Sequence, residues 1–162
     1  MKQLFTVVIF FISLNIFSQE NTVESFDERY EAIKQSVKQS IDSFAFDEDS
    51  KKRRYKVVFE GDKMRLLIMK ANGSAPINKG LVYDFSRVFQ FDDISFRRKD
   101  VAYINVRTYF LDKENYPKRK KWIKIKLIMK VFGHEHAETI MQALKDYNNI
   151  LLEKEKNSIS RN

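Results

Sequence analysis

Two clusters of basic side chains are the residues of this sequence best suited to bind a ligand. One cluster is the run Lys118-Arg119-Lys120-Lys121, followed by Trp122, Lys124 and Lys126. The other is Lys51-Lys52-Arg53-Arg54, with Lys56 close behind it. Clustered cations attract phosphate, anionic lipid, acidic polysaccharide or acidic protein, and a nearby indole can stack on a ring. The predicted ligand-binding residues are Arg53, Arg54, Lys56, Lys118, Arg119, Lys120, Lys121, Trp122, Lys124 and Lys126.

Two other interpretations of these cations stay open at this point. Lysines on an exposed hairpin also increase solubility and protect the edge of a sheet from pairing with other chains. The cations could also pair with acidic residues of the same chain, because charge is distributed unevenly along it. Residues 20–50 hold 3 Lys/Arg and 9 Asp/Glu, whereas residues 51–130 hold 22 Lys/Arg and 8 Asp/Glu.

Residues suited to catalysis or metal binding are scarce. The chain has no cysteine, which excludes thiol nucleophiles, thiolate metal sites and disulfides. His134 and His136 flank Glu135, but this spacing matches no known zinc motif, and residues two apart on a helix point in different directions. No Gly-x-Ser-x-Gly motif or glycine-rich phosphate loop is present. We therefore expect no catalytic residues, no metal and no cofactor. The alternative is a small envelope hydrolase or a lipid or ligand carrier whose site forms only in the fold.

The segment at residues 1–18 has the features of a secretory signal peptide. Lys2 precedes an apolar run from Leu4 to Phe17, and the small residue Ser18 follows. A helix of this run would span about 21 Å, less than the roughly 30 Å of a bilayer core. No cysteine follows the run, so a lipid-anchored form is excluded. The sequence predicts cleavage near Ser18 and a periplasmic or secreted bacterial protein.

Apolar periodicity then predicts a helix at each end of the remaining chain. Apolar side chains from Phe26 to Phe44 recur every three or four residues, with Thr22 as the expected N-cap. The same spacing recurs from Ala137 to Leu151. Asp47 to Ser50 are expected to form a linker, and residues 157–162 a loose tail.

Period-two alternation predicts strands in between. A hairpin with its turn at residues 60–63 comes first, followed by a loop at 71–80. Strands are also expected at 81–85, 87–91, 94–97, 101–111 and 122–131. In the last of these, Ile123, Ile125, Leu127, Met129 and Val131 should face the core, with Trp122, Lys124 and Lys126 on the opposite face.

The predicted fold class is α+β: a curved antiparallel sheet or partly open barrel of about six or seven strands, with an N-terminal helix and a C-terminal amphipathic helix. The runner-up is an open sheet with both helices on one face. We expect a signal peptide at 1–18 and an acidic helix and linker at 19–50. A β-rich domain with its C-terminal helix should follow at 51–156, and a loose tail at 157–162.

The order of elements over residues 54–152 resembles a pleckstrin-homology-like or GRAM-like domain, as does the segment from Val88 to Ile94. The resemblance implies a non-catalytic binding scaffold with basic ligand loops, although the leading helix and the export signal depart from that pattern. Together with the charge, it predicts an exported binding module that engages an anionic lipid, polysaccharide or acidic protein surface at the envelope. Nucleic acid is the less favoured partner, and no transmembrane segment is expected after signal cleavage.

Overall fold

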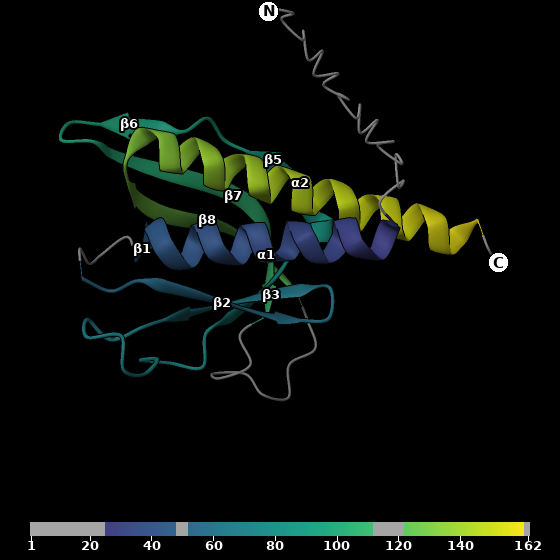
Figure 1. The fold of residues 1–162 in the computed structure, drawn as a ribbon, viewed down its shortest axis with the longest axis horizontal. Helices are drawn as coiled ribbons and strands as arrows, with labels where there is room; N and C mark the ends of the chain where they lie inside the picture. Colours follow the sequence, from purple (N-terminus) through teal and green to yellow (C-terminus); the bar gives the residue numbers. More distant parts are fainter. Residues whose placement is uncertain (1–24, 48–51, 112–121, 161–162) are drawn as a thin grey trace, which may run out of the picture.

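A computed structural model describes residues 25–47, 52–111 and 122–160 of the chain (Figure 1). Several features expected from the sequence lie outside these residues. They are the signal segment at 1–18, the linker residues 48–50, Lys51 and the basic run Lys118–Lys121. Within the described ranges, no helix is both long enough and apolar enough to cross a membrane.

Helix α1 (Phe26–Phe44) begins with a capping box. Ser25 Oγ accepts a hydrogen bond from the Glu28 N–H, and Glu28 Oε2 accepts one from the Ser25 N–H. The prediction of Thr22 as N-cap is wrong, because the Ser25–Glu28 pair satisfies two backbone donors at once and sets the start of the helix. The predicted apolar face is confirmed: Tyr30, Val37 and Ile41 are buried.

Helix α2 (His134–Ile159) closes the described chain, and its apolar face from Ala137 to Leu151 is buried as predicted. It continues beyond the expected end at Lys156, because the Ser160 N–H still donates to the Lys156 carbonyl. The two helices run antiparallel and side by side (Figure 1). Arg29 near the start of α1 pairs with Glu153 late in α2, while Phe44 at the end of α1 stacks on His136.

The described residues also form eight strands and one short 3-10 helix. In chain order these are β1 (Ala45–Phe46), β2 (Tyr55–Glu60), β3 (Lys63–Ile68), β4 (Leu81–Asp84), η1 (Phe85–Arg87), β5 (Gln90–Phe91), β6 (Ser95–Arg97), β7 (Val101–Leu111) and β8 (Ile123–Phe132). The hairpin, the loop after it and the two long strands are where the sequence predicts them. The expected strand at 87–91 is wrong in part, because the Asp84 carboxylate accepts from the Ser86 N–H and starts η1 instead.

All strand pairs are antiparallel, in the order β1-β8-β7-β4-β3-β2. The long strand β7 is central: β8 follows one edge, and β4, β5 and β6 share the other. The sheet nearly closes, because Phe46 pairs with Lys130 of β8 and also bridges to Arg54 just before β2. This nearly closed antiparallel barrel with a helix at each end confirms the α+β prediction. The short strand β1, which closes it, was not predicted.

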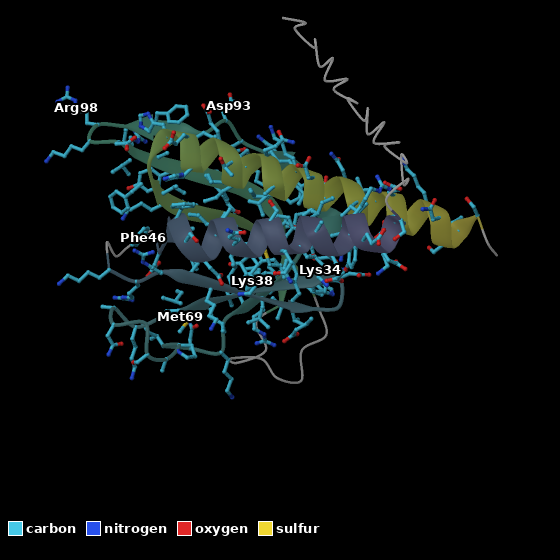
Figure 2. All side chains as sticks on the ribbon, in the orientation of Figure 1. Lys34, Lys38, Phe46, Met69, Asp93 and Arg98 are labelled. Carbon is cyan, nitrogen blue, oxygen red and sulfur yellow. The ribbon has the colours of Figure 1, made fainter. Side chains whose placement is uncertain are left out.

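Helix α1 covers the outer edge of β2 (Figures 1 and 2). Asp42 Oδ1 accepts from the Val57 N–H at 2.6 Å, and Lys38 Nζ donates to the Val57 carbonyl at 3.3 Å. Lys38 also pairs with Asp42 Oδ2 at 2.6 Å. One helical turn therefore satisfies both backbone groups of Val57, which an edge strand would otherwise leave unpaired.

The core is continuous between the sheet and both helices. Ile41 of α1, Val57 of β2, Ile104 of β7, Met129 of β8 and Leu144 of α2 are fully buried in one cluster. Leu127, Met129 and Val131 face this core as predicted, but Ile123 is 37% exposed because β8 begins beyond the edge of the core. The helix α1 is therefore part of the packed core of the β-rich region.

Candidate functional site

The register of β7 and β8 determines which polar side chains share the outer face of the sheet. Residues directly opposite each other on paired strands project to the same side. On β7, the residues from Ala102 to Thr108 at even positions are buried, so the odd positions face outward. The outer ladder consists of the pairs Tyr103–Lys130, Asn105–Ile128, Arg107–Lys126 and Tyr109–Lys124.

Lys124 lies among aromatic rings on the outer ladder. Its Nζ is 5.4 Å from the ring centroid of Phe89 and 6.0 Å from that of Tyr109. The Arg87 guanidinium lies 3.9 Å from the Tyr109 centroid. Phe89 is 51% exposed, so this group presents two cations and an accessible ring to solvent.

Lys126 and Arg107 share one carboxylate. Asp92 accepts from Arg107 Nε at 3.2 Å and lies 3.5 Å from Lys126 Nζ. The hydrogen bond from Arg107 lowers the pKa of Asp92; partial desolvation opposes the shift, and the charges of Arg107 and Lys126 reinforce it. Asp92 therefore stays ionised and neutralises one of the two cations, which leaves this group with a net positive charge.

An open groove of about 550 Å³ continues the outer ladder toward β6. Its lining is polar apart from Ile128 and contains no acidic residue: Ser95, Arg97, Tyr103, Asn105, Lys126 and Ile128. Within the part of the chain that the structure describes, the side chains of Ser95, Arg97 and Asn105 have no hydrogen-bond partner. The groove therefore offers unused donors and acceptors between two cations.

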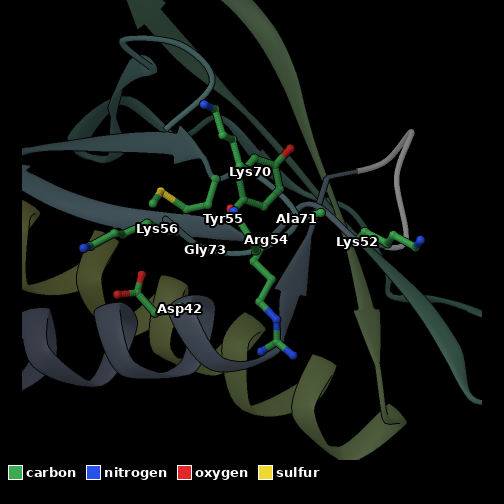
Figure 3. A pocket seen from close by; sticks show the side chains of 10 residues that line it. Asp42, Lys52, Arg54, Tyr55, Lys56, Lys70, Ala71 and Gly73 are labelled. Carbon is green, nitrogen blue, oxygen red and sulfur yellow. The ribbon is translucent and has the colours of Figure 1, made fainter. Parts of the chain in front are cut away.

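The second predicted cluster lines a different pocket, of about 390 Å³, at the start of β2 (Figure 3). Arg54 and Lys56 lie there with Lys70 from the loop after β3. Arg54 Nη1 donates to the Ser43 carbonyl at 2.9 Å, and its guanidinium lies 4.9 Å from the Phe46 ring centroid. Arg53 lies 3.6 Å from Asp47. Two of the three predicted cations are therefore engaged by the end of α1 and the residues after it.

The structure does not bring the two predicted clusters together. Phe46 lies beside both Arg54 and Lys130, and Lys124 is six residues away from Lys130 along β8. At roughly 3.4 Å per residue, Lys126 lies about 14 Å and Lys124 about 20 Å along β8 from Lys130. Trp122 lies against Lys63, whose Nζ is 5.7 Å from its ring centroid. Lys118–Lys121 lie outside the described residues, so their position relative to either cluster stays a prediction.

The acidic helix α1 packs on α2 and β2, on the other side of the sheet from the outer ladder (Figure 1). Near its start it takes part in a polar cluster: Tyr30 Oη and Lys154 Nζ both donate to Asp62 Oδ1 at 2.6 Å. Burial raises the pKa of Tyr30, and the hydrogen bond to Asp62 and the negative charge of Asp62 raise it further. Burial alone would raise the pKa of Asp62, but the hydrogen bonds from Lys154 and Tyr30 lower it. These contacts bind α1, the β2–β3 turn and α2 to one another.

Both histidines have contacts within the fold. His136 stacks on Phe44 with ring centroids 3.7 Å apart, and His134 packs beside Phe96. The His134 N–H donates to Asp100 Oδ1 at the start of α2. In residues 25–47, 52–111 and 122–160, no three His, Cys, Asp or Glu side chains are grouped so that they could hold a metal ion.

The sequence interpretation did not include four residues of this region: Arg87, Phe89, Arg97 and Arg107. The alternation of buried and outward residues in β7 was a usable signal for Arg107, because it places this residue on the outward side with Tyr103 and Tyr109. Arg87 ends η1, Phe89 lies between η1 and β5, and Arg97 ends β6, so only the pairing of these segments with β7 brings the three to one face.

No family model matches the chain, and no curated protein matches it. Among solved structures, the chain is similar to one described as the PH domain from TgAPH. The two are 11% identical, the match covers 78% of this chain and 98% of the other, and the TM-score is 0.41. The order of elements on which the predicted pleckstrin-homology-like resemblance rests, antiparallel strands followed by one C-terminal helix, is present in the structure over residues 54–152.

Proposed function

We propose that this chain is an exported, non-enzymatic binding module that engages an anionic partner at the cell envelope through Lys124 and Lys126. The observation that supports this proposal most is the grouping of four cations along the outer ladder. Arg107 and Lys126 share the Asp92 carboxylate, whereas Arg87 and Lys124 lie against the rings of Tyr109 and Phe89. Unbalanced positive charge on an exposed face attracts anionic surfaces and polymers. The apolar run at residues 4–17 supports export.

Arg53, Arg54 and Lys56 form a separate contact in this proposal, and we expect it to contribute less. The Asp47 carboxylate lies near Arg53, and the Ser43 carbonyl accepts from Arg54, so less of their capacity remains for a partner. The predicted run Lys118–Lys121 would extend the Lys124 group if its side chains lie beside it.

The test is binding of the chain without residues 1–18 to anionic vesicles and to an acidic polysaccharide, at increasing salt concentration. Binding should weaken steeply with salt, because the screening length shortens to about 8 Å at 0.15 M. Charge reversal of Lys124 and Lys126 together should reduce affinity at least about tenfold, since each surface cation contributes roughly 1 kcal/mol.

The matched control is charge reversal of Lys56 and Lys70, which makes the same charge change at the other pocket. We expect it to reduce affinity less than the reversal of Lys124 and Lys126. Equal losses in the two double variants, or binding that does not respond to salt, would contradict the proposal.

A further inference from the structure

We infer that the anionic partner is an acidic polysaccharide, bound along the outer ladder with its carboxylates on Arg97 and Lys126 and its hydroxyls on Asn105 and Ser95. This inference rests on the proposed function and names the class of its ligand. It follows from the mixture of chemical groups along the outer face, since charge alone would suit any anion.

The groove is the first observation in its favour. A volume of about 550 Å³ has room for several sugar rings along the outer ladder. Between its two cations, the groove offers the Asn105 amide, the Ser95 hydroxyl and the Tyr103 ring. Neutral donors and acceptors suit a ligand that has hydroxyl groups between its charges, because each buried hydroxyl then finds a partner.

The second observation is the form of the cations. The planar guanidinium of Arg97 can donate two parallel hydrogen bonds to one carboxylate. Arg97 is exposed at the end of β6, and it has no partner among the described residues. Arg97 pairs with Val101 and Lys126 with Arg107, so the two cations lie toward opposite ends of the groove and would hold separate carboxylates of one chain.

The third observation is the aromatic end of the same face. Tyr103 and Tyr109 are six residues apart on β7, which corresponds to about 20 Å of strand. Beyond Lys126, the exposed Phe89 ring packs edge-on to Tyr109, at 6.1 Å between centroids. An exposed ring provides an apolar surface on which one face of a sugar can pack, with Lys124 and Arg87 beside it for a further carboxylate. The polar groove, the cations Arg107 and Lys126 and the exposed Phe89 ring therefore follow one another along the outer ladder.

The experiment measures binding of polygalacturonate, neutral dextran and phosphatidylglycerol vesicles to the chain without residues 1–18. Arg97→Gln should weaken polygalacturonate binding about tenfold, because it removes a charge-assisted, two-pronged contact. Arg98→Gln is the matched control, because it removes the same charge at the neighbouring residue. The Arg98 side chain points away from the body of the protein (Figure 2). It should weaken binding no more than about twofold.

Asn105→Ala separates recognition from charge, because it leaves the net charge unchanged. We expect it to weaken polygalacturonate binding about threefold or more and to leave vesicle binding unchanged, with thermal unfolding confirming that the variant is folded. Arg97→Lys provides a second variant that keeps the charge and loses the planar fork, and it should fall between wild type and Arg97→Gln.

Equal effects of Arg97→Gln and Arg98→Gln, with none from Asn105→Ala, would overturn the inference by showing attraction that depends on charge alone. Binding to vesicles but not to polygalacturonate would also overturn it, while the proposed function would stand. Binding to neither would overturn both. Dextran binding equal to that of polygalacturonate would show that the carboxylates are not recognised.

Discussion

At the scale of single residues, polar side chains in the interior of this protein differ sharply in how well they are satisfied. Tyr30 donates to Asp62, and the buried Asp84 accepts from Lys63 Nζ at 2.6 Å. The Tyr147 hydroxyl is also buried, but it has no hydrogen-bond partner in the part of the chain that the structure describes. Burial raises its pKa, so it stays protonated. A buried polar group without a partner lowers stability relative to an apolar group of the same shape.

We therefore predict that Tyr147→Phe leaves the free energy of unfolding unchanged or raises it by about 1–2 kcal/mol. Tyr30→Phe is the matched comparison, because it removes a hydroxyl that does have a partner, and it should lower the same free energy by about 1 kcal/mol. Urea denaturation of both variants measures these changes. A loss of more than about 1 kcal/mol in Tyr147→Phe would show that its hydroxyl has a partner after all.

Asp92 is the residue that limits the positive charge of the outer ladder. The hydrogen bond from Arg107 lowers the pKa of Asp92, so this carboxylate stays ionised to a lower pH than an ordinary aspartate. Its contribution to stability is present above its unfolded-state pKa and is lost as the pH falls through the lowered, folded-state value. Over the same acid range, the face around Lys126 and Arg107 would become more positive.

Asp92→Asn should accordingly strengthen binding to a sulfated polysaccharide, whose charge does not titrate in this range. We expect an increase of about two- to fivefold, the effect of one partly screened surface charge. Asp93→Asn makes the same charge change at the neighbouring exposed residue and should give a smaller increase. The affinities of the two variants are compared at fixed salt. Equal increases would show that Asp92 limits binding no more than its neighbour Asp93 does.

At the scale of elements, helix α1 protects the edge of the sheet. The turn containing Lys38 and Asp42 satisfies both backbone groups of Val57, as described above. A strand edge with unpaired groups is a site for pairing with other chains. The acidic character of α1 therefore has a structural use at Asp42.

We predict that Asp42→Ala lowers the free energy of unfolding by about 1–3 kcal/mol, because the Val57 N–H loses its acceptor. Asp42→Asn retains an acceptor at the same place and should lower it by less than half as much. Chemical denaturation gives both values. Equal losses would mean that the charge pairing with Lys38, and not the contact with Val57, accounts for the effect.

At the scale of the whole molecule, the acidic helix and the β-rich region share one core. Tyr30, Val37 and Ile41 are buried against the sheet and α2, and the β1 strand that follows α1 joins β8. Burial of each of these side chains contributes roughly 1.5–3 kcal/mol, which together approaches the total stability of about 5–15 kcal/mol of a typical domain.

A chain that begins at Lys52 should therefore fail to fold cooperatively, whereas one that begins at Gln19 should fold. Near-UV circular dichroism and thermal unfolding distinguish the two. A sharp unfolding transition in the shorter chain would show that the β-rich region is stable without α1.

Local pattern was sufficient for much of this fold. Both helices follow from the spacing of apolar residues such as Val37 and Ile41, or Ile140 and Leu144, because a helix repeats every 3.6 residues whatever surrounds it. The β2–β3 hairpin and the alternation in β7 and β8 follow from the period of two in the same way. The outward position of Lys124 and Lys126 was predictable for this reason.

Only the tertiary structure decided which charges meet. Three separate segments supply Asp92, Arg107 and Lys126, which form one charged group. Arg54 donates to the Ser43 carbonyl because β1 closes the barrel beside it. Such contacts depend on strand register and on the folding of distant segments toward each other, and no periodicity along the chain contains that information. The sequence by itself therefore determined the elements and their exposed faces. The separation of the two basic clusters, the polar groove at Asn105 and the place of α1 in the core were decided by the packing of those elements.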